Sequence, residues 1–235
     1  MVWRIEADTT GNLLAVETRD KDTGRPAFSA FNYQTGESFI HEKPYGDRNW
    51  ALAGIANRKL ILRAFGQRSP DGAGIACIDA VDGELAWEQF NYVLLHVGNG
   101  QLMVRHRNFA GGYEQYLDPA TGNLTQFNKT AGKPTGPDIV LPQRYERDVP
   151  GLLANYAIYG DLYYYEIGSM QLWAFHEAIQ QAYRVRLVIT SDLSILDDRI
   201  ILRELIRMTP ELFFMIEQQL FIVSDNKREI VSYLV

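Results

Sequence analysis

Three short segments share one pattern, and this repeat constrains the fold more than any other feature of the chain. FNYQTGE (31–37), IDAVDGE (78–84) and LDPATGN (117–123) each read apolar, Asp or Asn, two spacers, Thr or Asp, then Gly. The Asp or Asn side chain can accept backbone N–H bonds from the turn that follows, and Gly suits the positive φ that ends a tight hairpin loop. The motif predicts a strand–turn–strand device whose structural positions are Asn32, Gly36, Asp79, Gly83, Asp118 and Gly122.

A second signature precedes the first at a nearly constant distance. GNL (11–13), RKL (58–60) and GQL (100–102) each lead into an apolar strand. The second repeat has four strand-like segments separated by Gly-, Asp- and Pro-rich turns: 51–56, 59–65, 74–79 and 84–90. A four-stranded antiparallel meander that recurs about every 40 to 47 residues is typical of a β-propeller blade. A β-sandwich also has short strands and regular turns, but it would not place the same turn motif in successive units.

Beyond the third repeat the pattern weakens. Residues 131–151 contain four of the nine prolines and predict an extended connection. Residues 156–167 predict the first hairpin of a fourth blade. Residues 171–183 have apolar side chains at helical spacing, which allows a short helix inserted in, or replacing, an outer strand. A final blade is predicted from RIILRELIRM, LFFMIE, LFIVSD and REIVSYLV. We therefore expect one all-β domain over 1–235, a propeller of about five four-stranded blades, in which VWRIE (2–6) pairs with the C-terminal strands to close the ring.

The segment IDAVDGELAW resembles the blade repeat of quinoprotein-type propellers, the pyrroloquinoline-quinone dehydrogenases and related scaffold propellers. FNYQTGESFI and LDPATGNLTQ match its turn but carry Ile40 and Gln126 where Trp87 stands. The resemblance implies the blade fold and a packing role for Trp87 between adjacent blades. No adjacent cysteine pair or cofactor ligand set accompanies it, so no cofactor is expected.

Composition narrows the function classes. The formal net charge is −6 and the sequence pI is about 5.3, which disfavours nucleic acid as a partner because phosphate binding needs clustered Lys and Arg. No apolar run approaches the length that a membrane-spanning helix needs, and no signal peptide is visible after Met1. The lone Cys77 cannot form an internal disulfide. We expect a cytoplasmic protein that is not bound to a membrane.

Motifs for catalysis or metal binding are not evident. The four histidines show no metal-ligand spacing, and His96 is expected to face Met103 across the hairpin at Asn99 and Gly100 rather than to pair with His106. Cys77 lies in an apolar strand, where an inert buried thiol is expected. The carboxylates of Asp47, Asp148 and Glu166 could serve a glycosidase but are more simply solvated loop charges. Tyr163, Tyr164 and Tyr165 are expected to pack on alternate strand faces.

Three arginines are candidates for anion binding. Each lies three residues after an apolar residue near the start of a predicted strand: Arg63 after Leu60, Arg105 after Leu102 and Arg203 after Ile200. Equivalent blade positions could bring their guanidinium groups to one face, with Arg68 and Arg107 in or beside the next hairpins. Such a group would suit a carboxylate or phosphate ligand. The alternative is that each arginine pairs locally with Asp or Glu.

These observations favour a non-enzymatic propeller that binds an unknown protein or a small molecule, such as an anion, on one face. A hydrolase or lyase with its acid and base at the mouth of the central channel is the alternative. A third possibility is a subunit held in a complex through residues 131–151.

Overall fold

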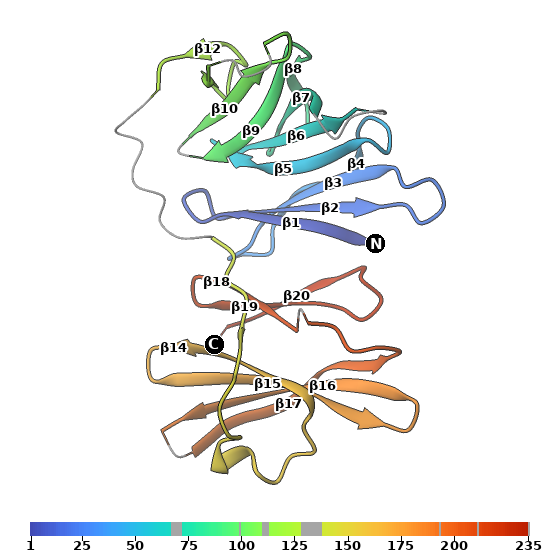
Figure 1. Ribbon diagram of the computed structural model, residues 1–235, viewed down its shortest axis with the longest axis vertical. Helices are drawn as coiled ribbons and strands as arrows, with labels where there is room; N and C mark the ends of the chain where they lie inside the picture. The colour runs from blue at the N-terminus through green and yellow to red at the C-terminus, as the bar shows by residue number, and fades with distance from the viewer. Residues whose placement is uncertain are drawn as a thin grey trace. The chain divides into compact units, whose positions relative to one another are not determined.

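A computed structural model describes residues 1–66, 72–98, 100–109, 113–127, 138–192, 194–210 and 212–234. Within these residues the chain is all-β, as predicted, with five antiparallel sheets and one short 3₁₀ turn at Gly151–Leu153 (Figure 1). None of the described segments is a helix with the length and apolar character needed to cross a membrane. The chain divides into two compact units, Met1–Asp138 and Ile139–Val235. That all five sheets form one domain stays a prediction.

The first unit contains three four-stranded sheets, and in each the strand order follows the chain, which makes each sheet a meander. The first sheet consists of β1 (Val2–Asp8), β2 (Leu13–Arg19), β3 (Pro26–Asn32) and β4 (Ser38–Pro44). The second consists of β5 (Trp50–Ala56), β6 (Lys59–Phe65), β7 (Gly72–Asp79) and β8 (Leu85–Gln89). The third consists of β9 (Tyr92–Gly98), β10 (Gln101–His106), β11 (Gln115–Leu117) and β12 (Leu124–Thr125).

The second sheet shows how local sequence sets these meanders. Its strands lie within one or two residues of the four predicted segments. A two-residue turn of Asn57 and Arg58 joins β5 to β6, with φ values of 51° and 56°. Positive φ at both central residues is the geometry whose twist matches that of two antiparallel strands, and Asn adopts it more readily than most residues.

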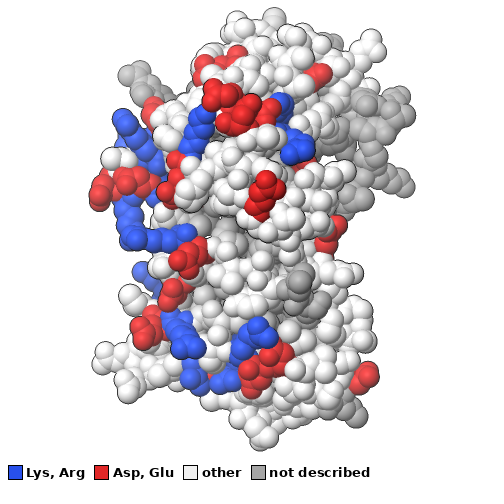
Figure 2. All heavy atoms as spheres, turned by 180° about the vertical axis from the view of Figure 1, so that it is seen from behind, with Lys and Arg blue, Asp and Glu red and all other residues white. Residues whose placement is uncertain are grey.

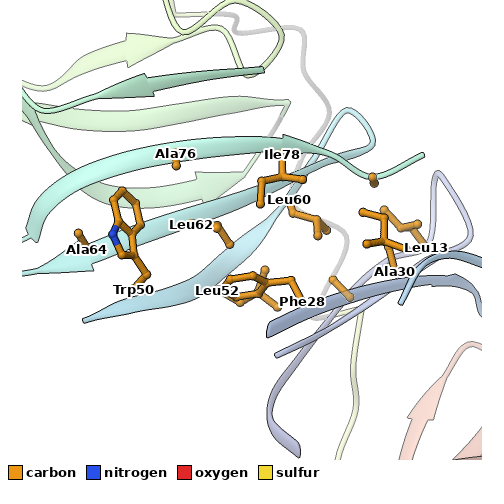
Figure 3. Packing of buried hydrophobic residues seen from close by; sticks show 13 residues of the cluster. Leu13, Phe28, Ala30, Trp50, Leu52, Leu60, Leu62, Ala64, Ala76 and Ile78 are labelled. Atoms are coloured by element: carbon orange, nitrogen blue, oxygen red, sulfur yellow. The ribbon is translucent and has the colours of Figure 1, made fainter. Parts of the chain in front are cut away.

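A buried apolar cluster joins the first and second sheets. Figure 3 shows Phe28 of β3, Leu52 of β5 and Leu60 of β6 close together between the sheets, each with at most 1% of its surface exposed. Burying one such side chain contributes about 1.5–3 kcal/mol. A second cluster, which includes Ile61, Cys77, Leu102 and Leu117, joins the second and third sheets. The sheets of the first unit are therefore held face to face by their side chains.

The first strands of successive sheets also lie side by side, because β1 contacts β5 and β5 contacts β9. The registers of the sheets correspond, since Leu60 pairs with Ile78 in the second sheet and Leu102 with Leu117 in the third. In the first sheet Leu14, and not Leu13 at the end of the GNL segment, pairs with Phe31. Both leucines are buried, so hydrophobicity alone did not distinguish the two registers.

The second unit contains a five-stranded and a three-stranded sheet. The fourth sheet of the chain consists of β13 (Gln143–Arg144), β14 (Tyr159–Ile167), β15 (Met170–Ile179), β16 (Ala182–Ser191) and β17 (Ser194–Leu205). The fifth consists of β18 (Phe214–Ile216), β19 (Gln219–Val223) and β20 (Ile230–Leu234). Leu172 and Leu187 from the fourth sheet and Met215 and Leu220 from the fifth belong to one buried cluster.

The predicted helix over 171–183 is wrong. These residues form most of β15, a turn that contains Gln180 with φ 51°, and the start of β16. Both faces of β15 are buried: Leu172 and Ala174 pack in one cluster and Trp173 and Phe175 in another. A strand buried on both faces shows a continuous apolar run rather than alternation, and such a run also satisfies helical spacing.

Two other predictions about strand pairing are corrected. The segment VWRIE lies in β1, which pairs with β2, whereas the fifth sheet comprises only β18, β19 and β20 among the described residues. The segment RIILRELIRM (199–208) lies mostly in β17 of the fourth sheet, because a tight turn at Asp192 folds β17 directly back on β16. Of the predicted connection, 131–137 lies outside the described residues, and 138–151 contributes the two-residue strand β13.

Candidate functional site

The three repeated turns share the same hydrogen bonds. In each, the Oδ1 atom of Asn32, Asp79 or Asp118 accepts the backbone N–H two residues later, at 3.0, 2.8 and 2.6 Å. The backbone N–H of the turn glycine donates to the carbonyl oxygen of the same Asn or Asp at 2.8, 3.0 and 2.8 Å, for Gly36, Gly83 and Gly122. These glycines have φ values of 75°, 74° and 69°. In all three turns the carboxylate or amide therefore has a structural role.

A fourth copy of this turn was not anticipated. In DKDTG (20–24), Oδ1 of Asp20 accepts the backbone N–H of Thr23 at 2.8 Å, and the N–H of Gly24 donates to the Asp20 carbonyl oxygen at 3.0 Å. The bond from Thr23 lowers the pKa of the Asp20 carboxyl. This copy joins β2 to β3, whereas the others join the third and fourth strands of a sheet, so the motif marks the turn and not a fixed place in a blade.

The residue four places after each turn glycine packs on the next repeat. A Cβ added to Gly83 would lie 3.5 Å from Cγ2 of Ile40, and one added to Gly122 would lie 2.6 Å from Cδ2 of Trp87. Ile40 and Trp87 thus occupy matching positions, each against the turn of the following sheet. The third repeat has Gln126 at this position, a polar and exposed residue.

A second departure of the third repeat concerns an ion pair. In the second sheet Lys59 pairs with Asp79 across β6 and β7, and its Nζ donates to Oδ2 of Asp79. This hydrogen bond lowers the pKa of the Asp79 carboxyl. In the third sheet Gln101 and Asp118 lie one residue beyond the Leu102–Leu117 pair, at the corresponding positions. The third sheet therefore keeps the carboxylate and has a neutral amide in place of the lysine.

The two residues that differ from the second repeat, Gln101 and Gln126, both line a polar cavity. Its volume is about 430 Å³, and it is lined by Asn57, Gly100, Gln101, Asp118, Thr125, Gln126 and Phe127. Nδ2 of Asn57 donates to the Gly100 carbonyl oxygen at 3.4 Å, and Nε2 of Gln101 donates to the Gln126 carbonyl oxygen at 2.8 Å. The exposed ring of Phe127 packs on that of Tyr116, with 4.8 Å between centroids. Asp118 is the one ionisable side chain among the described residues of the lining.

The candidate arginines do not line this cavity. Arg63 and Arg105 lie three residues after the equivalent residues Leu60 and Leu102, as expected. Leu60 faces the first sheet and Leu102 faces the second, so strand alternation places Arg63 between the second and third sheets and Arg105 on the far side of the third. Arg203 lies on β17, the last strand of a five-stranded sheet, and has no such equivalence.

The local contacts of these arginines differ. The guanidinium carbon of Arg63 lies 4.8 Å from the Phe65 ring centroid, and its buried Nε has no hydrogen-bond partner in the part of the chain that the structure describes. Nη1 of Arg107 donates to the Phe90 carbonyl oxygen at 3.1 Å, and Arg68 lies outside the described residues. An anion site formed by Arg63, Arg105 and Arg203 stays a prediction.

Other candidate chemistry from the sequence has structural explanations. Cys77 is fully buried, its Sγ lies 3.3 Å from the Pro119 carbonyl oxygen, and burial raises its pKa to about 12, which suppresses the reactive thiolate. Tyr163 and Tyr165 pack in one cluster and Tyr164 in another, so the tyrosine run alternates as expected. His96 pairs with Met103, also as expected.

The carboxylates considered for a glycosidase are all exposed, and Asp47 accepts a hydrogen bond from the backbone N–H of Asn49 at 2.9 Å. Asp148 and Glu166 lie in the second unit, the latter on β14. No group of three potential metal ligands occurs within the described ranges.

A charged network in the second unit was also not anticipated. Buried Glu177 accepts hydrogen bonds from Nε of Arg184 at 2.5 Å and from Nε of Arg186 at 3.0 Å. Nη1 of Arg186 also donates a hydrogen bond to Oδ1 of Asp198 at 2.5 Å. Oδ2 of Asp198 accepts a hydrogen bond from the Tyr156 hydroxyl at 2.8 Å. Each charge in this network meets an opposite charge, so it stabilises the sheet rather than offering a site. Positive and negative side chains also lie next to one another on the face shown in Figure 2. A further ion pair in the first unit joins Lys43 to Glu84 at 3.1 Å.

Comparisons with known proteins give one partial match to a family model and distant structural similarities. The family model "Domain of unknown function (DUF4905)" matches residues 7–87, which end at Trp87 and make up less than half of the chain. No curated protein matches the sequence.

Among solved structures, the chain is similar to the β-propeller domain of the trilobed protease from Pyrococcus furiosus, at 10% identity and a TM-score of 0.33, covering 99% of this chain and 68% of that one. It is also similar to BamB from Moraxella catarrhalis, at 11% identity and a TM-score of 0.23, covering 97% and 83%. Hydrazine synthase from Kuenenia stuttgartiensis is similar at 10% identity and a TM-score of 0.29, covering 98% and 70%. Similarities at this level assign no activity to this chain.

Proposed function

We propose that the chain is a propeller-type binding module without catalytic activity, which takes a small polar ligand in the cavity at the end of the third sheet. Three features of the first unit support the blade assignment: the meander order, the face-to-face sheets and the adjacent first strands β1, β5 and β9. In this proposal the two sheets of the second unit are the remaining blades. Cytoplasmic location and kinship with quinoprotein-type repeats stay predictions.

One observation carries the choice of site. At two positions where the second repeat has residues that pack or pair, Trp87 and Lys59, the third repeat has Gln126 and Gln101, and both of these line the cavity. Replacing an indole and an ammonium with shorter amides opens space and supplies donors and acceptors. Ligand sites commonly combine a concavity of this size with a few polar groups that fix orientation.

A hydrolase or lyase is less well supported at this cavity. General acid–base hydrolysis by the glycosidase scheme needs two carboxyl groups, whereas Asp118 is the one carboxylate of the described lining. The sheet edge around it contributes amides, a hydroxyl and an aromatic ring, which suit recognition of a ligand. We therefore favour binding over catalysis.

The test is a ligand screen on the full chain with a variant that closes the cavity. Gln126→Trp introduces the residue type found at the matching position of the second repeat, and Gln34→Trp makes the same change at an exposed position of the first turn. Binding of small polar compounds is measured by thermal shift and by changes in backbone amide NMR signals. We expect ligand binding by the original protein and by Gln34→Trp, with loss in Gln126→Trp at unchanged melting temperature. Unchanged binding by Gln126→Trp would exclude this cavity as the site.

A further inference from the structure

The carboxylate of Asp118 occupies a repeat position at which the preceding sheet forms an ion pair. In that sheet Lys59 and Asp79 are both partly buried, with 20% and 26% of their side chains exposed. A charge-assisted hydrogen bond of this kind is stronger than one between neutral groups. The fold thus places a cation beside the turn carboxylate in the second repeat, whereas in the third repeat the corresponding strand position holds the neutral Gln101.

Asp118 retains acceptor capacity toward the cavity. Its Oδ1 accepts the N–H of Ala120 in the turn. Among the described residues it makes no ion pair, and Oδ2 has no hydrogen-bond partner. Gln101, which stands opposite, is neutral and donates to the Gln126 carbonyl oxygen. A carboxylate can accept several hydrogen bonds, so a ligand group with N–H donors can still be accommodated.

The rest of the lining fits a primary ammonium group on an alkyl chain. An ammonium has three donors and no acceptor. Asp118 can accept one of them, and the Thr125 hydroxyl and an amide oxygen of Asn57 or Gln126 can accept the others. The exposed Phe127 ring offers a surface for the methylene chain and an attractive face for the charge. Because the described lining contains one negative and no positive side chain, its charge favours a cation over an anion.

We propose that the cavity binds the ammonium group of a lysine-like alkylamine, with Asp118 as its counter-ion in the place that Asp79 has toward Lys59. This inference rests on the proposed function and specifies the class of its ligand. The same ammonium chemistry could come from a free diamine or from a lysine side chain. In this proposal the ligand's ammonium takes the place toward Asp118 that Lys59 has toward Asp79.

The experiment is isothermal titration of the full chain with cadaverine and with Nα-acetyl-lysine methylamide, beside 1-pentanol and pentanoate as neutral and anionic probes of similar length. We expect one or both ammonium probes to bind and the other two not to bind. Tighter binding of cadaverine would identify a free amine as the source, and tighter binding of the blocked lysine would identify a side chain. Failure of both ammonium probes, or equal binding of 1-pentanol, would overturn the inference.

Two variants locate the effect. Asp118→Asn removes the charge while keeping the turn acceptor, because Asn32 makes the same turn in the first repeat. Gln101→Lys supplies an internal cation like Lys59. Each should weaken ammonium binding about ten- to a hundredfold. Asp79→Asn is the matched control outside the cavity and should leave affinity unchanged. If Asp118→Asn binds the ammonium probes with unchanged affinity, Asp118 is not their counter-ion.

The two proposals fail differently. If 1-pentanol or pentanoate binds, with NMR shifts at Asn57 and Thr125, and the ammonium probes do not, the cavity is a binding site and the ammonium inference is wrong. If ammonium probes bind to Gln126→Trp as they do to the original protein, the cavity is not the site and both proposals are wrong.

Discussion

The indole Nε1 of Trp87 donates a hydrogen bond to the carbonyl oxygen of Pro119 at 2.9 Å, which ties the last strand of the second sheet to the turn of the third. The ring lies against the Cα of Gly122, since an added Cβ there would come within 2.6 Å of Cδ2. Gly122 therefore meets two demands at once: a positive φ of 69° and the close approach of an aromatic ring.

Gly122→Ala should be far more destabilising than the same change at Gly36. A residue with a side chain at positive φ costs about 1–2 kcal/mol in either turn. Gly36 has no atom within 4 Å of the added Cβ, so Gly36→Ala should cost only that amount. At Gly122 the clash with Trp87 adds about 1–3 kcal/mol. Urea unfolding of both variants measures the difference.

A double variant separates the steric clash with Trp87 from the cost of a side chain at positive φ. Trp87→Leu should reduce the extra cost of Gly122→Ala, because the shorter side chain leaves room for a methyl group. Equal costs at the two glycines, or the same cost of Gly122→Ala with and without Trp87, would mean that the ring does not press on the turn.

Glu17 joins the first two sheets through charge and hydrogen bonding. Glu17 is fully buried. Its Oε1 accepts a hydrogen bond from Nε of Arg19 at 2.6 Å, and its Oε2 accepts one from the backbone N–H of Leu52 at 2.8 Å. Glu17→Ala should cost about 3–5 kcal/mol, because it leaves the buried N–H of Leu52 without its acceptor and the largely buried Arg19 guanidinium without its counter-charge. The Nη atoms of Arg19 keep their backbone carbonyl acceptors. The Arg4–Glu6 pair is the control, since its side chains are 39% and 29% exposed against 15% and 0% for Arg19 and Glu17, and Glu6→Ala should cost less than about 1 kcal/mol. Similar losses in denaturant unfolding would contradict this account.

The parts of the fold that could be predicted from sequence depend on local chemistry. Asp79 and Gly83 specify their turn within five residues, so the turn and its flanking strands follow from the motif alone. The predicted helix failed because Trp173 is buried on one face of β15 and Leu172 on the other, and sequence does not show that two layers cover a strand.

The cavity could not be predicted, for a related reason. Gln101 and Gln126 are unremarkable glutamines until the register aligns them with Lys59 and Trp87. The two glutamines indicate a site only by comparison with the residues at the same positions of the second repeat. That comparison requires the strand register, including the pairing of Lys59 with Asp79. For the arginines, strand alternation places Arg63 and Arg105 on successive layers of the first unit. An anion site that they share with Arg203 stays a prediction.

The Lys59–Asp79 pair should make stability sensitive to acid. Because its hydrogen bond with Lys59 lowers the pKa of folded Asp79 below the ordinary value of 3.8, the pair stabilises the fold above that pH. This contribution is lost as the pH falls through the lower, folded-state pKa. Asp79→Asn should therefore reduce the loss of stability between about pH 4 and pH 2. Unfolding free energies across this range test the prediction, with Lys43→Gln in an exposed pair as control.

His176 should give a second, separate dependence of the unfolding free energy on pH, which comes from the second unit. Its side chain is 2% exposed, its Nε2 accepts the backbone N–H of Thr209 at 3.3 Å, and burial lowers its pKa below 6.5. The unfolded chain therefore takes up a proton at a higher pH than the folded chain. Stability should fall as the pH drops below about 6.5, by at most about 1.4 kcal/mol per pH unit, until the folded-state pKa is reached.

His176→Gln removes the titrating group and keeps an acceptor, so its unfolding free energy should vary less between pH 7 and pH 5. The exposed His41 provides the matched variant, His41→Gln, which should follow the original curve. Parallel curves for all three proteins would show that His176 accepts a proton in the folded state as easily as in the unfolded chain, in conflict with its buried acceptor role toward Thr209.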